Sequence, residues 1–201
     1  MTARNSTAHT LDFTIDTLGW KAWITPVDHD AATPAQIKAL SGLPSKLRTI
    51  PYSLVLAHDP EALAERVPLF NTIMSAPGGL PVAERELATL VESVANGCVY
   101  CASVHGRRFA DLTGEPEIIQ SIYDEGFDTP LSARRRAIVD FAVKLSATPP
   151  TVAAEDIAAL GEAGLDELEI LDLIQAVAMF AWANRLMLTL GEPVPATAAA
   201  A

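Results

Sequence analysis

Cysteine and aromatic residues are scarce in this sequence, which has two cysteines among 201 residues and 6% aromatic side chains. So few cysteines exclude a fold that several disulfides hold together. Hydrophobic residues nevertheless make up 50% of the chain, which is enough to bury a sizeable core without cross-links. Many of them are Ala and Leu, which suit packed helices better than the Val, Thr and Tyr of a sheet protein do. The composition therefore predicts an all-α protein.

Positively charged residues are also in the minority, with 14 Lys and Arg against 25 Asp and Glu, and the formal net charge is −11. Neither nucleic acid nor an anionic membrane offers counter-charge to an acidic surface. We therefore expect neither of them among the partners of this protein.

The first twenty residues, MTARNSTAHTLDFTIDTLGW, contain no apolar run of signal-peptide length, and their acidic residues do not suit a transit peptide. These features predict a cytoplasmic protein. In a reducing cytosol a close pair of cysteines is more often catalytic, redox-sensing or metal-binding than structural. The two cysteines are therefore the first candidates for a functional site.

The pattern of apolar, proline and glycine residues divides the chain into three parts. Residues 1–33 are expected to form an irregular arm, residues 34–191 a helical domain, and residues 192–201 a disordered tail. Beyond a short helix that follows the arm, the helical stretches are expected at 59–74, 81–96, 98–112, 115–126, 132–148, 151–164 and 166–191.

Three polar residues are expected to cap these helices. Thr33 and Asp59 each precede a proline, which is well suited to the first position of a helix, and Ser132 opens a longer helix. Pro68 falls inside the second of these helices, where it either kinks the helix or starts a new one.

The last helical stretch, 166–191, is apolar nearly all round. This pattern indicates burial in the core or between subunits, and a membrane span is the competing interpretation. Asp172, Gln175, Asn184 and Arg185 divide the stretch into pieces shorter than the roughly 20 apolar residues that a bilayer requires. We therefore expect a buried helix.

The stretch NGCVYCASVH places both cysteines and a histidine on one helix. Cys98 and Cys101 are three residues apart and His105 follows four residues later, so all three project from the same face. Cys98 follows the helix-breaking Asn96 and Gly97, so it lies in the first turn, where backbone N–H groups and the helix dipole stabilise a thiolate. His105 is placed to take the thiol proton of Cys101, which makes Cys101 the candidate for first attack.

A carboxylate on the preceding helix is expected to orient His105. The turn before Cys98 can fold that helix back, and Glu86 is the proposed partner, with Glu84 and Glu92 as competitors. The same four residues could instead bind zinc, but structural zinc sites favour sulfur-rich sets with a second paired motif, which this chain lacks. We therefore expect no metal and no other cofactor.

The stretch ERELATLVESVANGCVYCASVHGRRFADL resembles the AhpD-like alkylhydroperoxidase branch of the carboxymuconolactone decarboxylase superfamily. The shared pattern is a glutamate, eleven residues, CxxC, three residues and a histidine, which Glu86, Cys98, Cys101 and His105 match in register. The resemblance covers about residues 50–112 and selects Glu86 from its competitors. It implies an all-helical bundle in which the CxxC begins a central helix, and an assembly of trimers or hexamers.

The resemblance also implies a function, that of a thiol peroxidase for organic hydroperoxides. In that chemistry Cys101 attacks the peroxide, Cys98 closes the disulfide, and His105 and Glu86 relay the proton. A dithiol protein or a small thiol is the implied reductant. Some peroxidases of the family have a histidine where this chain has Tyr100, whose phenol can donate a hydrogen bond but is a poor base. Two alternatives remain open: a cofactor-free lyase of the decarboxylase type, and a redox switch or binding protein without significant turnover.

Overall fold

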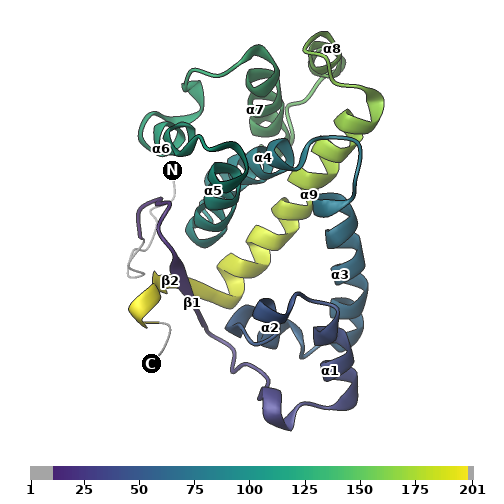
Figure 1. Ribbon diagram of the computed structural model, residues 1–201, viewed down its shortest axis with the longest axis vertical. Helices are drawn as coiled ribbons and strands as arrows, with labels where there is room; N and C mark the ends of the chain where they lie inside the picture. Colours follow the sequence, from purple (N-terminus) through teal and green to yellow (C-terminus); the bar gives the residue numbers. More distant parts are fainter. Residues whose placement is uncertain (1–10, 199–201) are drawn as a thin grey trace.

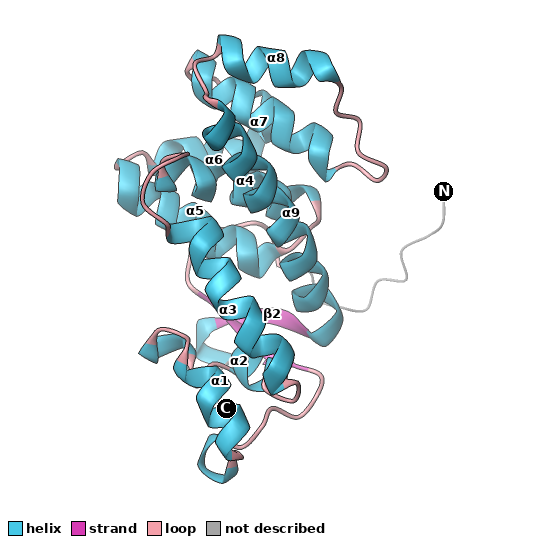
Figure 2. Ribbon diagram, turned by 90° about the vertical axis from the view of Figure 1, so that its right-hand side faces the viewer, coloured by secondary structure: helices cyan, strands magenta, loops and turns pink. Residues whose placement is uncertain are grey.

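The computed structural model describes residues 11–198, which form an elongated helical bundle with one small sheet (Figures 1 and 2). This confirms the all-α class that the sequence predicts. The helices of the described part are α1 (Pro34–Ser41), α2 (Pro51–Leu56), α3 (Pro60–Ser75), α4 (Val82–Ala95), α5 (Val99–Thr113), α6 (Pro116–Glu125), α7 (Ala133–Ser146), α8 (Ala154–Glu162) and α9 (Glu167–Leu190).

The helix starts follow the capping residues of the sequence. Thr33 accepts a hydrogen bond from the backbone N–H of Gln36, whose side chain in turn accepts one from the N–H of Thr33. Asp59 accepts from the N–H of Ala62 at 3.0 Å, and Ser132 caps α7 in the same way. The expected caps are therefore confirmed.

Pro68 lies inside α3 without dividing it. The helix runs as one element from Pro60 to Ser75, and the carbonyl of Pro68 accepts a hydrogen bond from the hydroxyl of Thr72 at 3.0 Å. The sequence left open a kink or a second start, and the structure shows a single continuous helix. The short α2, which begins at Pro51, was not expected from the sequence.

Helix α9 crosses the middle of the molecule, with α3 on one flank and α6, α7 and α8 at one end (Figure 1). It packs against α4, α7 and α3, and its side chains at Leu173, Val177 and Phe180 are buried. In the described part of the chain α9 alone is long and apolar enough to cross a membrane, but core helices meet the same criterion. The structure places α9 in the core, as the sequence predicts.

A two-stranded antiparallel sheet joins the two ends of the described chain. Strand β1 (Leu18–Ala22) pairs with β2 (Gly191–Pro195), with Trp20 opposite Pro193. The indole N–H of Trp20 donates to the carbonyl of Met187 at 3.3 Å, and only 4% of Trp20 is exposed. A Cβ at Gly191 would lie 2.3 Å from the Trp20 ring, so glycine is required where the strands meet.

These strands correct two expectations. Residues 18–22 are not irregular, and the tail expected to be disordered from residue 192 is ordered through the short 3₁₀ helix Ala196–Ala198. The pairing depends on a contact between distant parts of the chain, which local composition does not reveal. Residues 1–10 of the arm and 199–201 of the tail lie outside the described residues.

The loop between α3 and α4 is fixed to α9 by one carboxylate. Oδ2 of Asp172 accepts from the N–H of Leu80 at 3.0 Å and from Nη2 of the buried Arg85 at 2.9 Å. Gly79 has a φ of +60°, and a Cβ there would lie 2.0 Å from that same oxygen. This loop sets the start of α4, the helix that carries Glu86.

Two neighbouring glycines provide a matched test of this anchor. Gly78→Ala and Gly79→Ala both place a side chain at positive φ, which costs roughly 1–2 kcal/mol, but only at Gly79 does the new Cβ displace Asp172. We expect Gly79→Ala to lower the free energy of unfolding in urea by about 3 kcal/mol more than Gly78→Ala, because a buried ion pair is broken. Equal losses for the two variants would show that Asp172 does not hold the loop.

Candidate active site

The cysteine pair lies at the junction of α4 and α5, which pack side by side. The connection is short because Gly97, at a φ of +74°, turns the chain, and the N–H of Cys98 donates to the carbonyl of Ser93 at 2.8 Å. Cys98 is the N-cap of α5, so the helix begins one residue later than expected. The turn brings α5 back along α4, as the sequence predicts.

The two thiols are free, buried and in contact. Their sulfurs are 2.8 Å apart, and 2% of Cys98 and 6% of Cys101 are exposed. The hydrogen-bond contact with Cys98, together with burial, raises the pKa of Cys101 well above its usual value. The charge of Arg66 acts in the opposite direction. Cys101 is therefore a protonated thiol near neutral pH and needs a base before it can attack as a thiolate.

A buried carboxylate orients the histidine. Nδ1 of His105 lies 2.5 Å from Oε2 of Glu86, which has no exposed surface, and the imidazole packs edge-on against Phe180 with the ring centroids 4.3 Å apart. Nη2 of Arg108 lies 3.0 Å from the other oxygen of Glu86. A carboxylate at Nδ1 fixes the proton on that nitrogen and leaves Nε2 as the basic atom. Within residues 11–198, no side chain forms a hydrogen bond with Nε2.

The two competing glutamates of α4 face other partners. Glu84 forms an ion pair with Arg134 at 2.9 Å. Glu92 is hydrogen-bonded to Ser146, and burial raises its pKa. Of the three glutamates considered from the sequence, Glu86 alone meets His105.

Cys101 and His105 open into one cavity with a volume of about 300 Å³ between α2, α3, α5 and α9. Most of its wall is apolar. Besides Cys101 and His105, the polar side chains that line it are Tyr52, Ser53, Arg66, Asn71, Ser75, Tyr100 and Arg108. The position of Cys101 in this wall gives a small substrate direct access to its sulfur.

Cys98 lines a different and smaller cavity, with a volume of about 170 Å³. Its wall includes Trp20 and Trp23 from the N-terminal segment and Pro193 from β2, and Tyr100 lines both cavities. Burial raises the pKa of Tyr100, so its phenol stays protonated. The two thiols of the pair are thus reached from two sides.

Sequence reasoning missed most of the polar residues that line the larger cavity, among them Arg66 and Tyr52. Arg66 lies on α3 and Tyr52 on α2, outside the motif that drew attention to α4 and α5. The only local signal is the i, i+4 spacing of Arg66 and Phe70, which puts both on one face of α3. Within residues 11–198 no group of three or more His, Cys, Asp or Glu side chains is arranged to hold a metal ion.

Comparison with known proteins agrees with this architecture. The sequence profile of the carboxymuconolactone decarboxylase family matches residues 60–144, which include both cysteines, Glu86 and His105. An uncharacterised peroxidase-related protein from Ralstonia eutropha JMP134, described as an alkylhydroperoxidase AhpD core, is 25% identical with a TM-score of 0.74 over 84% of this chain and 90% of its own. No curated protein matches the chain significantly.

Two further structures share the fold. A peroxidase-related protein from Silicibacter sp. TM1040 is 26% identical, with a TM-score of 0.69 over 84% of this chain and 91% of its own. The debrominase Bmp8 is 20% identical, with a TM-score of 0.73 over 90% of this chain and 96% of its own. The chain is thus similar to the carboxymuconolactone decarboxylase family over residues 60–144, and in its fold to an alkylhydroperoxidase AhpD core.

The contact between the two sulfurs leads to a prediction about the pH at which Cys101 becomes a thiolate. Because the contact with Cys98 is the largest cause of the raised pKa, we expect Cys98→Ala to lower the pKa of Cys101 toward the usual value of about 8.5. The thiolate fraction then rises at lower pH than in the wild type. Alkylation rates of the Cys101 peptide, followed by mass spectrometry from about pH 6 to about pH 10, measure the shift. Superimposable profiles would contradict it.

Proposed function

We propose that this protein is a thiol peroxidase that reduces organic hydroperoxides through a Cys98–Cys101 dithiol and disulfide cycle. The observation that carries the proposal is that Cys101 and His105 line one cavity, with Glu86 behind the histidine and Cys98 behind the first thiol. The superfamily and the peroxidase-related neighbours point to the same class of chemistry.

The first half of the cycle oxidises Cys101. Nε2 of His105 takes the thiol proton, and the thiolate sulfur attacks the terminal peroxide oxygen, which breaks the O–O bond. The alkoxide that leaves takes the proton from the imidazolium and departs as the alcohol, and Cys101 becomes a sulfenic acid. Glu86 stabilises the imidazolium between these two transfers, because its carboxylate is held at Nδ1.

The second half forms the disulfide. The sulfur of Cys98, already in contact with Cys101, attacks the sulfenic sulfur and releases water. A reducing thiol then attacks one sulfur of the disulfide, and a second thiol completes the return to the dithiol. We propose that the reductant, a dithiol protein or a small thiol, reaches Cys98 from its own cavity while the substrate cavity stays separate.

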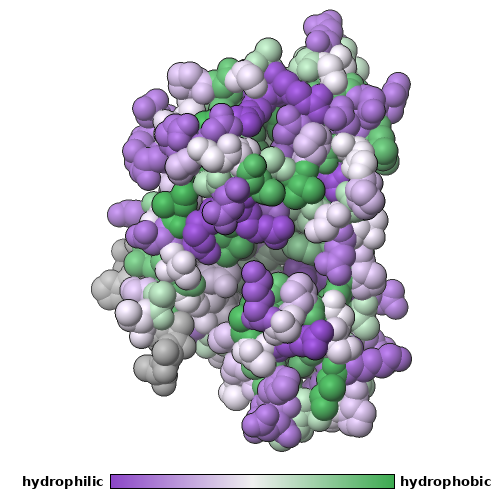
Figure 3. Space-filling model, in the orientation of Figure 1, coloured by the Kyte–Doolittle hydropathy of each residue, from purple (hydrophilic) through white to green (hydrophobic). Residues whose placement is uncertain are grey.

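We also propose a cellular compartment, a range of partners and an assembly for this protein. A free buried dithiol suits the reducing cytoplasm, and the net charge of −11 disfavours nucleic acid and anionic membranes as partners. We propose a homotrimer or homohexamer, the assembly that the resemblance implies. Four large apolar side chains that α9 leaves exposed support an interface between subunits: Leu168, Leu171, Trp182 and Leu188. The face of the molecule drawn in Figure 3 intersperses hydrophobic with hydrophilic residues. Light scattering of the purified protein distinguishes these assemblies from a monomer.

The cysteine variants test the order of attack. With near-stoichiometric organic hydroperoxide, we expect the wild type to lose two hydrogens and to link Cys98 to Cys101, as read by intact and peptide mass spectrometry. Cys101→Ser abolishes turnover, and Cys98→Ser accumulates a sulfenic acid on Cys101 that dimedone traps. A Cys101→Ser protein as active as the wild type would rule out the peroxidase mechanism.

The double Cys→Ser protein separates the alternatives. Full activity of that protein on a lactone acid would favour a lyase in which Glu86 and His105 act as acid and base. A wild-type protein that forms the disulfide only slowly, with no selectivity among oxidants and with a change in assembly, would favour a redox switch.

Replacing the buried carboxylate tests the relay. We expect Glu86→Gln to lower the rate of Cys101 oxidation by about 10²- to 10⁴-fold over the pH profile of the reaction, the usual contribution of general acid–base catalysis. Glu84→Gln, two residues earlier on α4, is the matched control and keeps the wild-type profile because Glu84 faces Arg134. Stopped-flow kinetics supply the rates and circular dichroism checks the fold. Equal profiles for the two variants would remove Glu86 from the mechanism.

A further inference from the structure

The cavity at Cys101 contains a guanidinium that lacks an acidic partner. Two arginines line it, and Arg108 forms an ion pair with Glu86. Within the described residues no carboxylate lies within ion-pair distance of Arg66, and its Nε is buried without a hydrogen-bond partner. An unneutralised cation in an apolar cavity is costly, and a bound anion would offset that cost.

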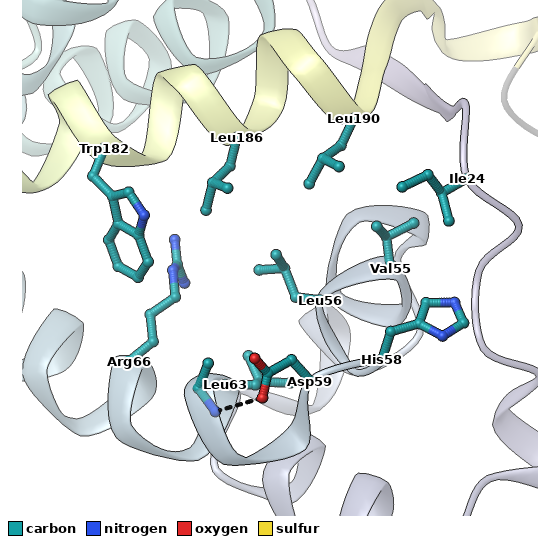
Figure 4. A pocket seen from close by; sticks show the side chains of 11 residues that line it. Ile24, Val55, Leu56, His58, Asp59, Leu63, Arg66, Trp182, Leu186 and Leu190 are labelled. Atoms are coloured by element: carbon teal, nitrogen blue, oxygen red, sulfur yellow. Dashed lines mark hydrogen bonds between the residues drawn. The ribbon is translucent and has the colours of Figure 1, made fainter.

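Aromatic rings hold this guanidinium in place. Its central carbon lies 4.9 Å from the ring centroid of Phe70, 5.4 Å from that of Trp182 and 5.9 Å from that of Tyr52. Figure 4 shows Arg66 and Trp182 facing each other between α3 and α9. The ring faces attract the positive charge, but a carboxylate forms far stronger hydrogen bonds with the N–H groups. The side chain is thus preorganised and still able to bind.

A second donor lies beside it. Tyr52 lines the same cavity, and its buried hydroxyl has no hydrogen-bond partner among the described residues other than the adjacent guanidinium of Arg66. Burial raises the pKa of Tyr52 to about 12, against the nearby charge of Arg66, so the O–H is present at neutral pH. The guanidinium of Arg66 carries N–H donors and no acceptor. Both groups can therefore donate hydrogen bonds to a ligand, in a protein whose net charge is −11.

We propose that Arg66 and Tyr52 form an anion-binding subsite, and that the substrates are small organic hydroperoxides that carry a carboxylate on an apolar body. The proposal rests on the proposed peroxidase function and names the substrate class of that same site. Arg66 binds the carboxylate, and the peroxide group at the other end of the molecule reaches the sulfur of Cys101.

The size and lining of the cavity agree with such a substrate. Its volume of about 300 Å³ is at the lower end of ligand pockets, which span roughly 300–1,000 Å³. Leu43, Ile50 and Phe70 are among the apolar residues of its wall. A second cavity of about 320 Å³, drawn in Figure 4, shares Arg66 with it and is lined mainly by apolar side chains. The carboxylate of such a substrate would thus contact the guanidinium of Arg66, and the apolar body of the substrate would pack against the apolar wall of the cavity.

Two matched hydroperoxides test the preference. Cumene hydroperoxide and its para-carboxylate derivative differ only in the anionic group. We expect the wild type to use the carboxylate with a kcat/KM about 10- to 100-fold higher, which is the discrimination that a charge-assisted hydrogen bond provides. Because the charge of Arg66 also lowers the pKa of Cys101, Arg66→Met is expected to slow the reaction with both compounds and to bring the ratio of their kcat/KM values to about 1, while Arg66→Lys keeps part of the preference.

The control variant is Arg185→Met, which removes one positive charge from α9. Arg185 is exposed and does not line the cavity of Cys101, and among residues 11–198 its side chain donates a hydrogen bond only to the carbonyl of Ala181. We expect this variant to keep the wild-type preference. Thermal unfolding of each variant separates a binding defect from a folding defect.

A binding measurement tests the anion-binding subsite independently of the peroxidase reaction. Calorimetry with 4-isopropylbenzoate, which has no peroxide group, is expected to show binding to the reduced wild type and to Arg185→Met, and at least tenfold weaker binding to Arg66→Met. Equal use of the two hydroperoxides, with no binding of the benzoate, overturns the subsite and leaves the peroxidase intact. Benzoate binding that depends on Arg66, without oxidation of Cys101 by either hydroperoxide, supports the subsite and overturns the peroxidase.

Discussion

The hydrogen bond between Glu86 and His105 is the interaction on which the geometry of the site depends. A fully buried carboxylate is costly unless it is paired and hydrogen-bonded, so its neighbours must be held at fixed positions. From one helix, α5, the imidazole of His105 hydrogen-bonds one carboxylate oxygen and the guanidinium of Arg108 forms an ion pair with the other, while Glu86 itself comes from α4. The packing of α4 against α5 therefore also fixes the contact that holds a proton on Nδ1 of His105.

The same constraint explains the polarity of the surrounding core. Helix α4 is buried along most of its length although it carries Arg85, Glu86 and Glu92. Each of these charges has its own partner: Asp172 for Arg85, His105 for Glu86, and Ser146 for Glu92. Because each partner lies on a different element, a sliding movement of α4 would leave several buried charges without partners at once. The site is consequently built on a rigid helix rather than on a loop.

Local sequence patterns predicted much of this molecule. The caps at Thr33, Asp59 and Ser132 are satisfied within three residues, so they can be read from sequence alone. The pairing of β1 with β2 and the place of Arg66 depend on how distant elements meet, and no local pattern encodes that arrangement. The raised pKa of Cys101 is of the same kind, since the contact with Cys98 and burial cause it and neither can be read from local sequence.

The strand pair that carries Trp20 also bears on the order of folding. The contact between Trp20 and Met187 spans 167 residues, and closing so long a loop has a large entropic cost that only the assembled bundle can offset. The wall of the Cys98 cavity therefore forms after the helices have packed and after β2 has left the ribosome. Until then the thiol of Cys98 is open to oxidants and to other thiols.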